Sequence, residues 1–383
     1  MFSSYKYILR VFLFMSGIFS VSTGTFAEQG IFPDSIKLGQ SLPLSGPLAE
    51  SGTEYRDGAQ AYFTWINSKG GIHGRRIELI SIDDAYVVEK TIVNAKKLLD
   101  NDKVFALFGM YGSANYEAAL PIIHERNVPS IAPLSGSDDL RAKSSPNTFW
   151  LRASYGDEAE KIVDQLTVTG INRIAVLYQS DAFGKAGLSG VEKALKKRNL
   201  TLAGSASYNK TTNDVSEAVK SIRGVAPQAV IMLSSYSPTA SFIKQMRLSG
   251  KQPLFFALSS VGYTMLHAQL GRESAGIAIS QVVPYPWNRT TPVVRELESL
   301  PKNFQPKAGI TYTTLEGFIA AKVMTEALRR AGAKLTREKL VAALEGMRPY
   351  DVGGYTVTYG AADRSGSHFV EIAIVNNSGN LMR

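Results

Sequence analysis

Residues 36–53 read IKLGQSLPLSGPLAESGT, and residues 104–135 read VFALFGMYGSANYEAALPIIHERNVPSIAPLS. Both segments belong to one stretch in which short apolar runs alternate with helical patterns. A repeated order of strand, helix and strand is typical of a parallel β-sheet with helices on both faces. We therefore predict strands at four apolar runs, which are Ile36–Leu38, Ile77–Ile82, Val104–Phe108 and Ser130–Ala132.

Loops rich in Gly, Ser, Pro or Asp follow each of these predicted strands, and a helix is predicted over Glu54–Ser68. In open parallel sheets, ligands bind beside the carboxyl ends of the strands. We therefore expect a binding site at one edge of the sheet. Its loops would be Leu42–Thr53, Asp83–Val87, Gly109–Asn115 and Pro133–Asp139.

Two features of these loops have more than one interpretation. Ser113 opens a helical pattern after a glycine-bearing turn, so it is either the N-cap of that helix or a contact for a ligand carboxylate, together with the helix-start N–H groups. Asp83 and Asp84 are adjacent carboxylates. The sequence offers no further oxygen ligands at a calcium-loop spacing, which favours capping of the next helix over a metal site.

A second alternation of strands and helices begins near Asp157 and runs to Leu258. The tract Pro284–Arg289 carries two prolines and a tryptophan, and we interpret it as a crossing between two α/β units. The remaining chain predicts long helices and then two strands that pair with each other. The helices are expected at Thr313–Ala331 and Thr336–Leu344, and the strands at Tyr355–Tyr359 and His368–Val375.

The first 27 residues are typical of a secretory signal peptide. Lys6 and Arg10 give a positive start, Val11–Phe19 is almost entirely apolar, and Thr25-Phe26-Ala27 offers a cleavage site. An uncleaved anchor helix is the alternative, and the short, interrupted apolar run argues against it. The chain has no Cys, which excludes disulfides, thiolate metal sites and a lipid-anchoring cysteine. We therefore expect cleavage after Ala27 and a periplasmic location.

The chain is long enough for two domains, with 383 residues and a hydrophobic fraction of 44%. Its formal net charge is +9. The basic residues are spread along predicted helices and turns and do not interleave with aromatic residues. We interpret them as solvated helix faces and expect no nucleic-acid partner.

Six short motifs, taken in order along the chain, resemble one known family, the periplasmic leucine/isoleucine/valine-binding proteins. The likeness extends from about Ile36 to Gly379. The motifs are Leu44-Ser45-Gly46-Pro47, Asn67–Ile72, Asp83-Asp84, Gly109–Ser113, Tyr236-Ser237-Pro238 and Thr311-Tyr312.

This resemblance implies a type I periplasmic binding protein fold, an α/β fold of two doubly wound Rossmann-like lobes joined by a three-segment hinge. Lobe 1 would be residues 36–153 plus 285–366, and lobe 2 residues 154–284 plus 367–383. A small solute, an amino acid or a related carboxylate or amide, would bind in the cleft between the lobes. The protein would act as a monomer with a membrane permease and its cytoplasmic ATPase subunits, with no cofactor and no metal.

The family's ligand-binding positions fall on ten residues of this chain. Ser113 matches the serine that grips the ligand carboxylate, Leu134 and Gly136 match backbone contacts, and Phe183 and Tyr236 match aromatic residues that cover the ligand. The remaining expected contacts are Tyr111, Ser135, Ser51, Ser259 and Lys307.

Several positions depart from the family pattern, and one is Lys307, which replaces an aromatic residue near the mouth of the expected cleft. Gly136 replaces a threonine, whose hydroxyl Ser135 or Ser137 would then supply. Ser259, or Ser260, replaces the glutamate that amino-acid binders place against the ligand α-ammonium. A buried ammonium needs a paired acceptor charge. We therefore expect a carboxylate or amide ligand without an α-amino group, unless Asp181 supplies the missing charge.

An enzyme is the first alternative function. The four His residues are scattered, and the sequence contains no nucleophile elbow, HExxH pair or P-loop. A periplasmic sensing partner of a receptor is the second alternative, and binding alone does not separate it from transport. A transcription regulator would need a DNA-binding segment where the signal peptide stands.

Overall fold

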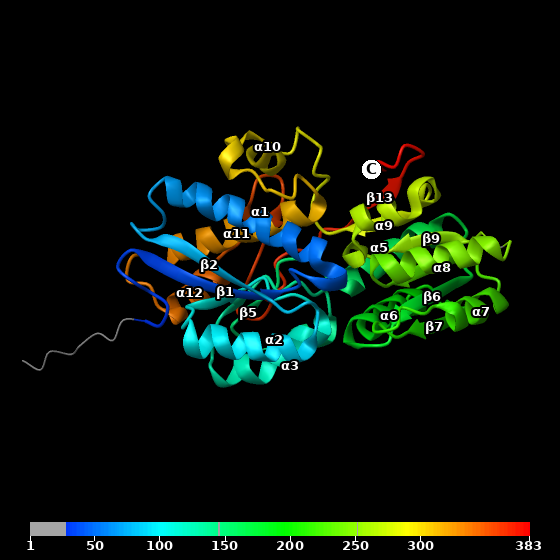
Figure 1. Ribbon diagram of the computed structural model, residues 1–383, viewed down its shortest axis with the longest axis horizontal. Helices are drawn as coiled ribbons and strands as arrows, with labels where there is room; N and C mark the ends of the chain where they lie inside the picture. The colour runs from blue at the N-terminus through cyan, green and yellow to red at the C-terminus, as the bar shows by residue number, and fades with distance from the viewer. Residues whose placement is uncertain (1–27, 145, 251) are drawn as a thin grey trace, which may run out of the picture.

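The computed structural model describes residues 28–144, 146–250 and 252–383, so the predicted signal peptide lies outside the described residues. Figure 1 shows two α/β lobes side by side, one mostly blue and cyan and one mostly green and yellow. Each lobe is built around its own sheet, as the alternating sequence pattern predicts. The prediction of a two-lobed α/β fold is therefore confirmed.

The first sheet is entirely parallel, in the order β2-β1-β3-β4-β5. Its strands are β1 (Ser35–Leu42), β2 (Arg76–Asp83), β3 (Ala106–Phe108), β4 (Ser130–Ile131) and β5 (Thr148–Phe149). The helices of this lobe are α1 (Ala49–Ser68), α2 (Val88–Lys96), α3 (Ser113–Glu125), α4 (Asp138–Lys143), α10 (Pro292–Ser299), α11 (Tyr312–Ala331) and α12 (Arg337–Glu345).

The second sheet has the order β14-β13-β10-β9-β8-β6-β7. Five of its strands are parallel, namely β6 (Ile174–Gln179), β7 (Gly204–Tyr208), β8 (Ala229–Leu233), β9 (Leu254–Ala257) and β10 (Ala278–Gln281). The tail adds β13 (Glu371–Val375) and β14 (Leu381–Met382) in antiparallel orientation. The helices are α5 (Tyr155–Val168), α6 (Ala182–Lys196), α7 (Ser216–Gly224), α8 (Tyr236–Leu248) and α9 (Tyr263–Leu270).

The predicted pairing of the two tail strands is wrong. β12 (Thr356–Val357) pairs instead with β11 (Tyr350–Asp351) in a separate two-stranded sheet, while β13 joins the second sheet beside β10. The physical reason is a tight turn at Gly353 and Gly354, which both adopt positive φ. The Asp351 carboxylate accepts hydrogen bonds from both of their N–H groups, so the chain folds back locally.

The chain crosses between the sheets at three places. It leaves β5 for α5, leaves β10 for α10, and returns from β12 to β13. The first and third crossings lie side by side, because Trp150 N donates to Arg364 O at 2.9 Å and Gly366 N donates to Trp150 O at 2.7 Å. We propose that the lobes divide in these crossings, at 153/154, 284/285 and 366/367.

The predicted start of the first long helix at Glu54 is wrong, because α1 already begins at Ala49. A 3-10 turn over Gly46–Leu48, with proline in its first turn, precedes the helix and explains the early start. As a result, Ser51 lies in the first turn of α1 instead of in a loop.

Helices α1 and α11 approach each other more closely than any side chain at the contact would allow. A Cβ added to Gly58 would lie 1.9 Å from Thr314 O, and one added to Gly317 would lie 2.1 Å from Tyr55 O. Beside this contact the rings of Tyr62 and Phe318 meet edge to face at 5.1 Å. The two glycines therefore let α11, which comes from the far end of the sequence, complete the first lobe.

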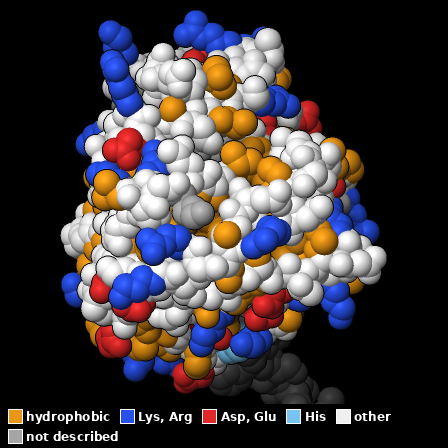
Figure 2. All heavy atoms as spheres, turned by 90° about the vertical axis from the view of Figure 1, so that its right-hand side faces the viewer, with side chains coloured by type: hydrophobic (Ala, Val, Ile, Leu, Met, Phe, Trp, Pro, Cys, Tyr) orange, Lys and Arg blue, Asp and Glu red, His pale blue; other side chains and the backbone are white. Residues whose placement is uncertain are grey.

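Figure 2 shows the face of the second lobe. On this face Lys and Arg side chains are scattered among Asp and Glu side chains and do not gather into one patch. Among the described residues, no helix combines the length and apolar character needed to cross a membrane.

We expect Gly58→Ala to lower the thermal unfolding midpoint, because the new methyl group would push α1 away from α11. Overpacking of this kind costs about 1–3 kcal/mol or more. The matched control is Gly224→Ala in α7, where an added Cβ meets nothing within 4 Å. The control should leave stability unchanged or raise it slightly. Equal melting curves for the two variants would contradict the close contact.

Candidate functional site

A cluster of buried hydroxyl groups lies at the start of α3. Ser113 Oγ is 2.7 Å from Ser135 Oγ and 3.4 Å from the Tyr155 hydroxyl. All three side chains are almost completely buried. The hydroxyls come from three separate parts of the chain, the first residue of α3, the loop after β4 and the first turn of α5.

The prediction that Ser113 is the N-cap of α3 is wrong by one residue. Ser113 is the first helical residue, and Gly112, with φ of 91°, is the N-cap. Gly112 is required here because the Tyr86 ring fills the space of a Cβ, at 2.8 Å. No side chain caps α3, so the first N–H groups of this helix lack a side-chain partner at the end where Ser113 stands. Such a helix start favours a bound anion.

The neighbouring loop is held in place through its backbone. Leu134 N donates to Met110 O at 2.8 Å, and Leu134 O accepts from Gly112 N at 3.1 Å. The backbone groups of Leu134 therefore join two loops of the site to each other. Ser137 caps α4 by accepting from Leu140 N, so Ser135 is the serine of this loop that joins the cluster.

Gly136 packs directly under the Tyr155 ring. A Cβ at Gly136 would lie 2.5 Å from Tyr155 Cδ1, and Tyr155 N donates to Gly136 O at 2.6 Å. The tyrosine thus fills the space that a larger side chain at position 136 would need. No local sequence signal marks this role of Tyr155, because its partners lie about twenty and forty residues away along the chain.

Aromatic side chains from both lobes surround the cluster. The Phe183 ring lies 5.2 Å from the Tyr155 ring, and the Tyr111 ring lies 6.1 Å from that of Tyr86. Burial raises the pKa of Tyr111, and the hydrogen bond between its hydroxyl and Ser51 only partly opposes that shift. Apolar rings beside a buried polar cluster suit a small ligand with one charged end.

Ser51 of the first lobe and Tyr236 of the second both lie beside Gly262. A Cβ added to Gly262 would lie 3.5 Å from Ser51 Oγ and 3.4 Å from Tyr236 Cδ1. The structure therefore brings together the predicted site residues of α1, the loops after β3 and β4, α6 and α8. Lys307 lies elsewhere, in a hollow of about 600 Å³ lined by residues of α1, β2 and the segment 303–307.

The two lobes touch near the candidate site. The Gln179 side-chain amide of the second lobe donates to the Tyr86 hydroxyl of the first at 3.4 Å, and Lys210 Nζ lies 4.5 Å from the Tyr86 ring centre. Asp181, which we considered as a partner for a ligand ammonium, caps α6 and pairs with Lys210 at 3.5 Å. The charge of Asp181 is thus already compensated.

The predicted helix-capping role of Asp83 and Asp84 is wrong, because α2 has Val87 as its N-cap and no capping side chain. Asp83 instead accepts hydrogen bonds from the N–H groups of Leu44 and Ser45. Burial alone would raise the pKa of Asp83, but its hydrogen bonds outweigh that effect, so the pKa is lowered. Asp84 accepts from the hydroxyls of Ser41 and Thr91. The two carboxylates therefore fix the loop after β1, which leads to Ser51.

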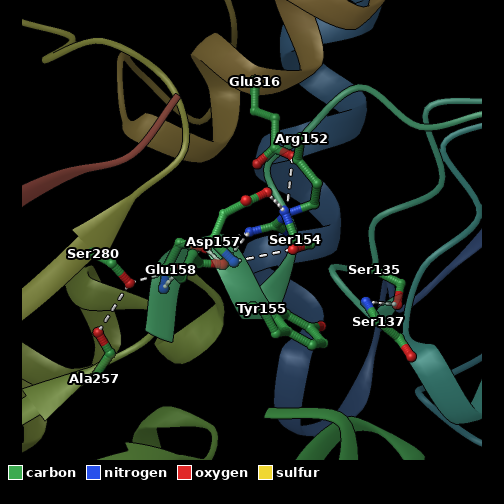
Figure 3. A network of polar contacts seen from close by, with 12 residues as sticks. Ser135, Ser137, Arg152, Ser154, Tyr155, Asp157, Glu158, Ala257, Ser280 and Glu316 are labelled. Atoms are coloured by element: carbon green, nitrogen blue, oxygen red, sulfur yellow. Dashed lines mark hydrogen bonds and ion pairs between the residues drawn. The ribbon is translucent and has the colours of Figure 1, made fainter. Parts of the chain in front are cut away.

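Ser259 hydrogen-bonds to Glu158, which belongs to a buried polar network that also contains Arg152, Ser280 and Glu316 (Figure 3). Its N–H and hydroxyl donate to Glu158 at 2.8 and 3.1 Å, and the Ser280 hydroxyl donates to the same carboxylate at 2.6 Å. Arg152 donates to Ser259 Oγ. An acid thus lies behind Ser259, and both of its oxygens already accept hydrogen bonds.

Arg152 is shared between two carboxylates. Its guanidinium is 3.8 Å from Glu158 Oε1 and 3.7 Å from Glu316 Oε1, and all three side chains are buried. Burial raises the pKa of both glutamates, and the Arg152 charge opposes that shift. The network joins the first crossing to α5 in one lobe and to α11 in the other.

Sequence reasoning missed Arg152, Glu158 and Glu316. One signal was available for Glu316, which stands within the otherwise apolar segment YTTLEGFIAA of a predicted helix. A charged residue inside a buried helix is usually paired or functional. No comparable local signal marks Glu158, whose helix has an ordinary polar face.

A second acidic pair lies in the first turns of α1. Glu54 is almost fully buried, and burial followed by the charge of Glu50 raises its pKa to about 7. Glu50 accepts a hydrogen bond from the backbone of Met265, in α9 of the other lobe. Glu54 therefore keeps a proton into the neutral pH range, next to a contact between the lobes.

Comparisons with known proteins agree on one family. Residues 35–380 match the family model described as periplasmic binding protein. A substrate-binding periplasmic protein from Ralstonia solanacearum is 36% identical, with a TM-score of 0.84 over 91% of this chain and 99% of that one. A possible leucine/isoleucine/valine-binding protein from Rhodopirellula baltica is 28% identical, with a TM-score of 0.85 over 91% and 96%. Leu/Ile/Val-binding protein homolog 7 of Brucella abortus is 26% identical over 79% of each chain.

We expect Arg152→Met to destabilise the protein strongly, because it leaves two buried carboxylates without their cation. Removing one partner of a buried ion pair costs about 3–5 kcal/mol. The loss should shrink at acidic pH, where the glutamates take up protons. The measurement is the unfolding midpoint across pH 4–8, and the control is Arg126→Met, an exposed arginine paired with Asp100. A variant as stable as the control at neutral pH would refute the shared-cation role.

Proposed function

This chain belongs to the periplasmic binding protein family, and we propose that it is the solute-binding component of an ABC importer. It captures a small carboxylate in the cleft between its lobes and delivers it to a membrane permease with cytoplasmic ATPase subunits. It acts in the periplasm as a monomer, after removal of residues 1–27. The family consists of solute-binding proteins and not of enzymes.

The main support for this proposal is a cluster of buried hydroxyl groups at the start of α3, where no side chain caps the helix. The cluster consists of Ser113, Ser135 and Tyr155. Hydroxyls and free helix N–H groups are donors, and together they suit a carboxylate. The rings of Phe183 and Tyr111 stand beside them and suit the apolar body of a small organic acid.

The ligand of this proposal has no α-ammonium. In amino-acid binders an acid faces that group, whereas here Ser259 stands at the position and donates to Glu158. Glu158 accepts from Ser259 and Ser280 and lies beside Arg152, so its charge is compensated within the protein. An ammonium entering this cleft would lose hydration at a cost of several kcal/mol with little to offset it.

We expect the des-amino acids isocaproate and hydrocinnamate to bind at least as tightly as leucine and phenylalanine, their amino-acid counterparts. The carboxylate end is the same in each pair, so the comparison isolates the ammonium. Titration calorimetry of the mature protein with the four compounds provides the test. Tight binding of the amino acids alone would contradict the ligand class, and would identify Glu316 as the first candidate partner for the ammonium.

We expect Ser113→Ala to weaken isocaproate binding by roughly 10- to 150-fold, since it removes one hydrogen bond to an ion, worth about 1.5–3 kcal/mol. The control is Ser130→Ala, which deletes an equally buried hydroxyl at the amino end of β4. If Ser113→Ala binds isocaproate as well as the control does, the hydroxyl cluster is not the carboxylate site.

A further inference from the structure

Tyr155 occupies a fixed position at the junction of the lobes. It is the first residue of α5, and the capping box of Ser154 and Asp157 holds its backbone, with bonds of 2.9 and 3.0 Å. His368, from the third crossing, lies 3.0 Å from the same Asp157 carboxylate. The side chain of Tyr155 is only 3% exposed. Its ring therefore has little freedom to move, and the hydroxyl stays beside the site (Figure 3).

The phenol of Tyr155 is poorly paired for a buried group. Its contact with Ser113 Oγ, at 3.4 Å, is longer than the 2.5–3.0 Å typical of hydrogen bonds between hydroxyls. Ser113 has a shorter contact with Ser135, at 2.7 Å. Buried polar groups are normally satisfied. The Tyr155 hydroxyl is thus a donor that a ligand acceptor beside Ser113 would complete.

The packing of Tyr155 explains why this donor is present. Its ring covers Gly136, where a Cβ would come within 2.5 Å of the ring, so the loop after β4 has no room for a hydroxyl-bearing side chain at that position. The tyrosine reaches the cluster from the other lobe instead, and its ring lies edge to face against Phe183 at 5.2 Å. One residue thereby supplies both a donor and part of the apolar wall.

We propose that Tyr155 is a specificity-determining ligand contact, whose hydroxyl is the third donor to the ligand carboxylate and favours that ion over the corresponding neutral amide. This inference rests on the function proposed above. Hydrogen bonds to an ionised acceptor are about twice as strong as those between neutral groups. Burial raises the pKa of Tyr155, so the hydroxyl keeps its proton at neutral pH.

The experiment compares isocaproate with its primary amide, by calorimetry, on the wild-type protein and on Tyr155→Phe. This variant keeps the ring over Gly136 and removes only the hydroxyl. We expect isocaproate to bind about tenfold more weakly to Tyr155→Phe, and the amide to change by less than about threefold. The matched control is Tyr359→Phe, a fully buried tyrosine whose hydroxyl has no hydrogen-bond partner among the described residues. The control should change neither affinity.

Each other outcome has a definite meaning. If Tyr155→Phe binds isocaproate within twofold of the wild type while Ser113→Ala does not, Tyr155 is not a donor to the ligand, and the proposed function stands. If both probes weaken equally in Tyr155→Phe, the residue acts through packing, and the specificity role is overturned. If the wild-type protein binds neither probe, the proposed ligand class fails and this inference fails with it.

Discussion

One buried arginine is shared between two carboxylates, and the arrangement of the region between the lobes depends on this pairing. Arg152 lies in the first crossing, with Glu158 of α5 on one side and Glu316 of α11 on the other. An ionised acid at either position would be costly in the interior without a cation. Glu158 lies near the start of α5, so the pairing ties this end of the helix, which carries Tyr155, to α11. Ser259 also hydrogen-bonds to Arg152 and Glu158. The residue that would face a ligand ammonium is therefore already paired with charged groups of the protein.

The remaining site follows the rule for parallel sheets, because its residues stand just beyond the carboxyl ends of strands. Ser51 follows β1, Ser113 follows β3 and Ser135 follows β4, while Phe183 follows β6 and Tyr236 follows β8. The two lobes thus place the hydroxyls of Ser113 and Ser135 from one lobe near the rings of Tyr155 and Phe183 from the other. The donors are fixed by backbone pairing between loops, as at Leu134, and the rings by the starts of α6 and α8.

The sequence was sufficient for the parts of the fold that local pattern governs. The alternation around β1 to β4 predicted the sheet. The family resemblance implied Ser113 and Phe183 as ligand contacts, and that role stays a prediction. The start of α1 was missed because Gly46-Pro47 begins a 3-10 turn that the helical periodicity does not register. The charged network was missed because it is non-local. Glu158 is separated by 101 residues from Ser259 and by 122 from Ser280, and only the folded second lobe brings them together.

A crystal structure of the mature protein with isocaproate tests the central claim most directly, that the cleft holds a carboxylate at the start of α3. We predict density for the ligand between the lobes, with its carboxylate about 2.5–3.0 Å from Ser113 Oγ and from the Tyr155 hydroxyl, and its alkyl chain against Phe183. A ligand bound instead in the hollow beside Lys307, or held by Glu316 with its carboxylate away from Ser113, would contradict the account.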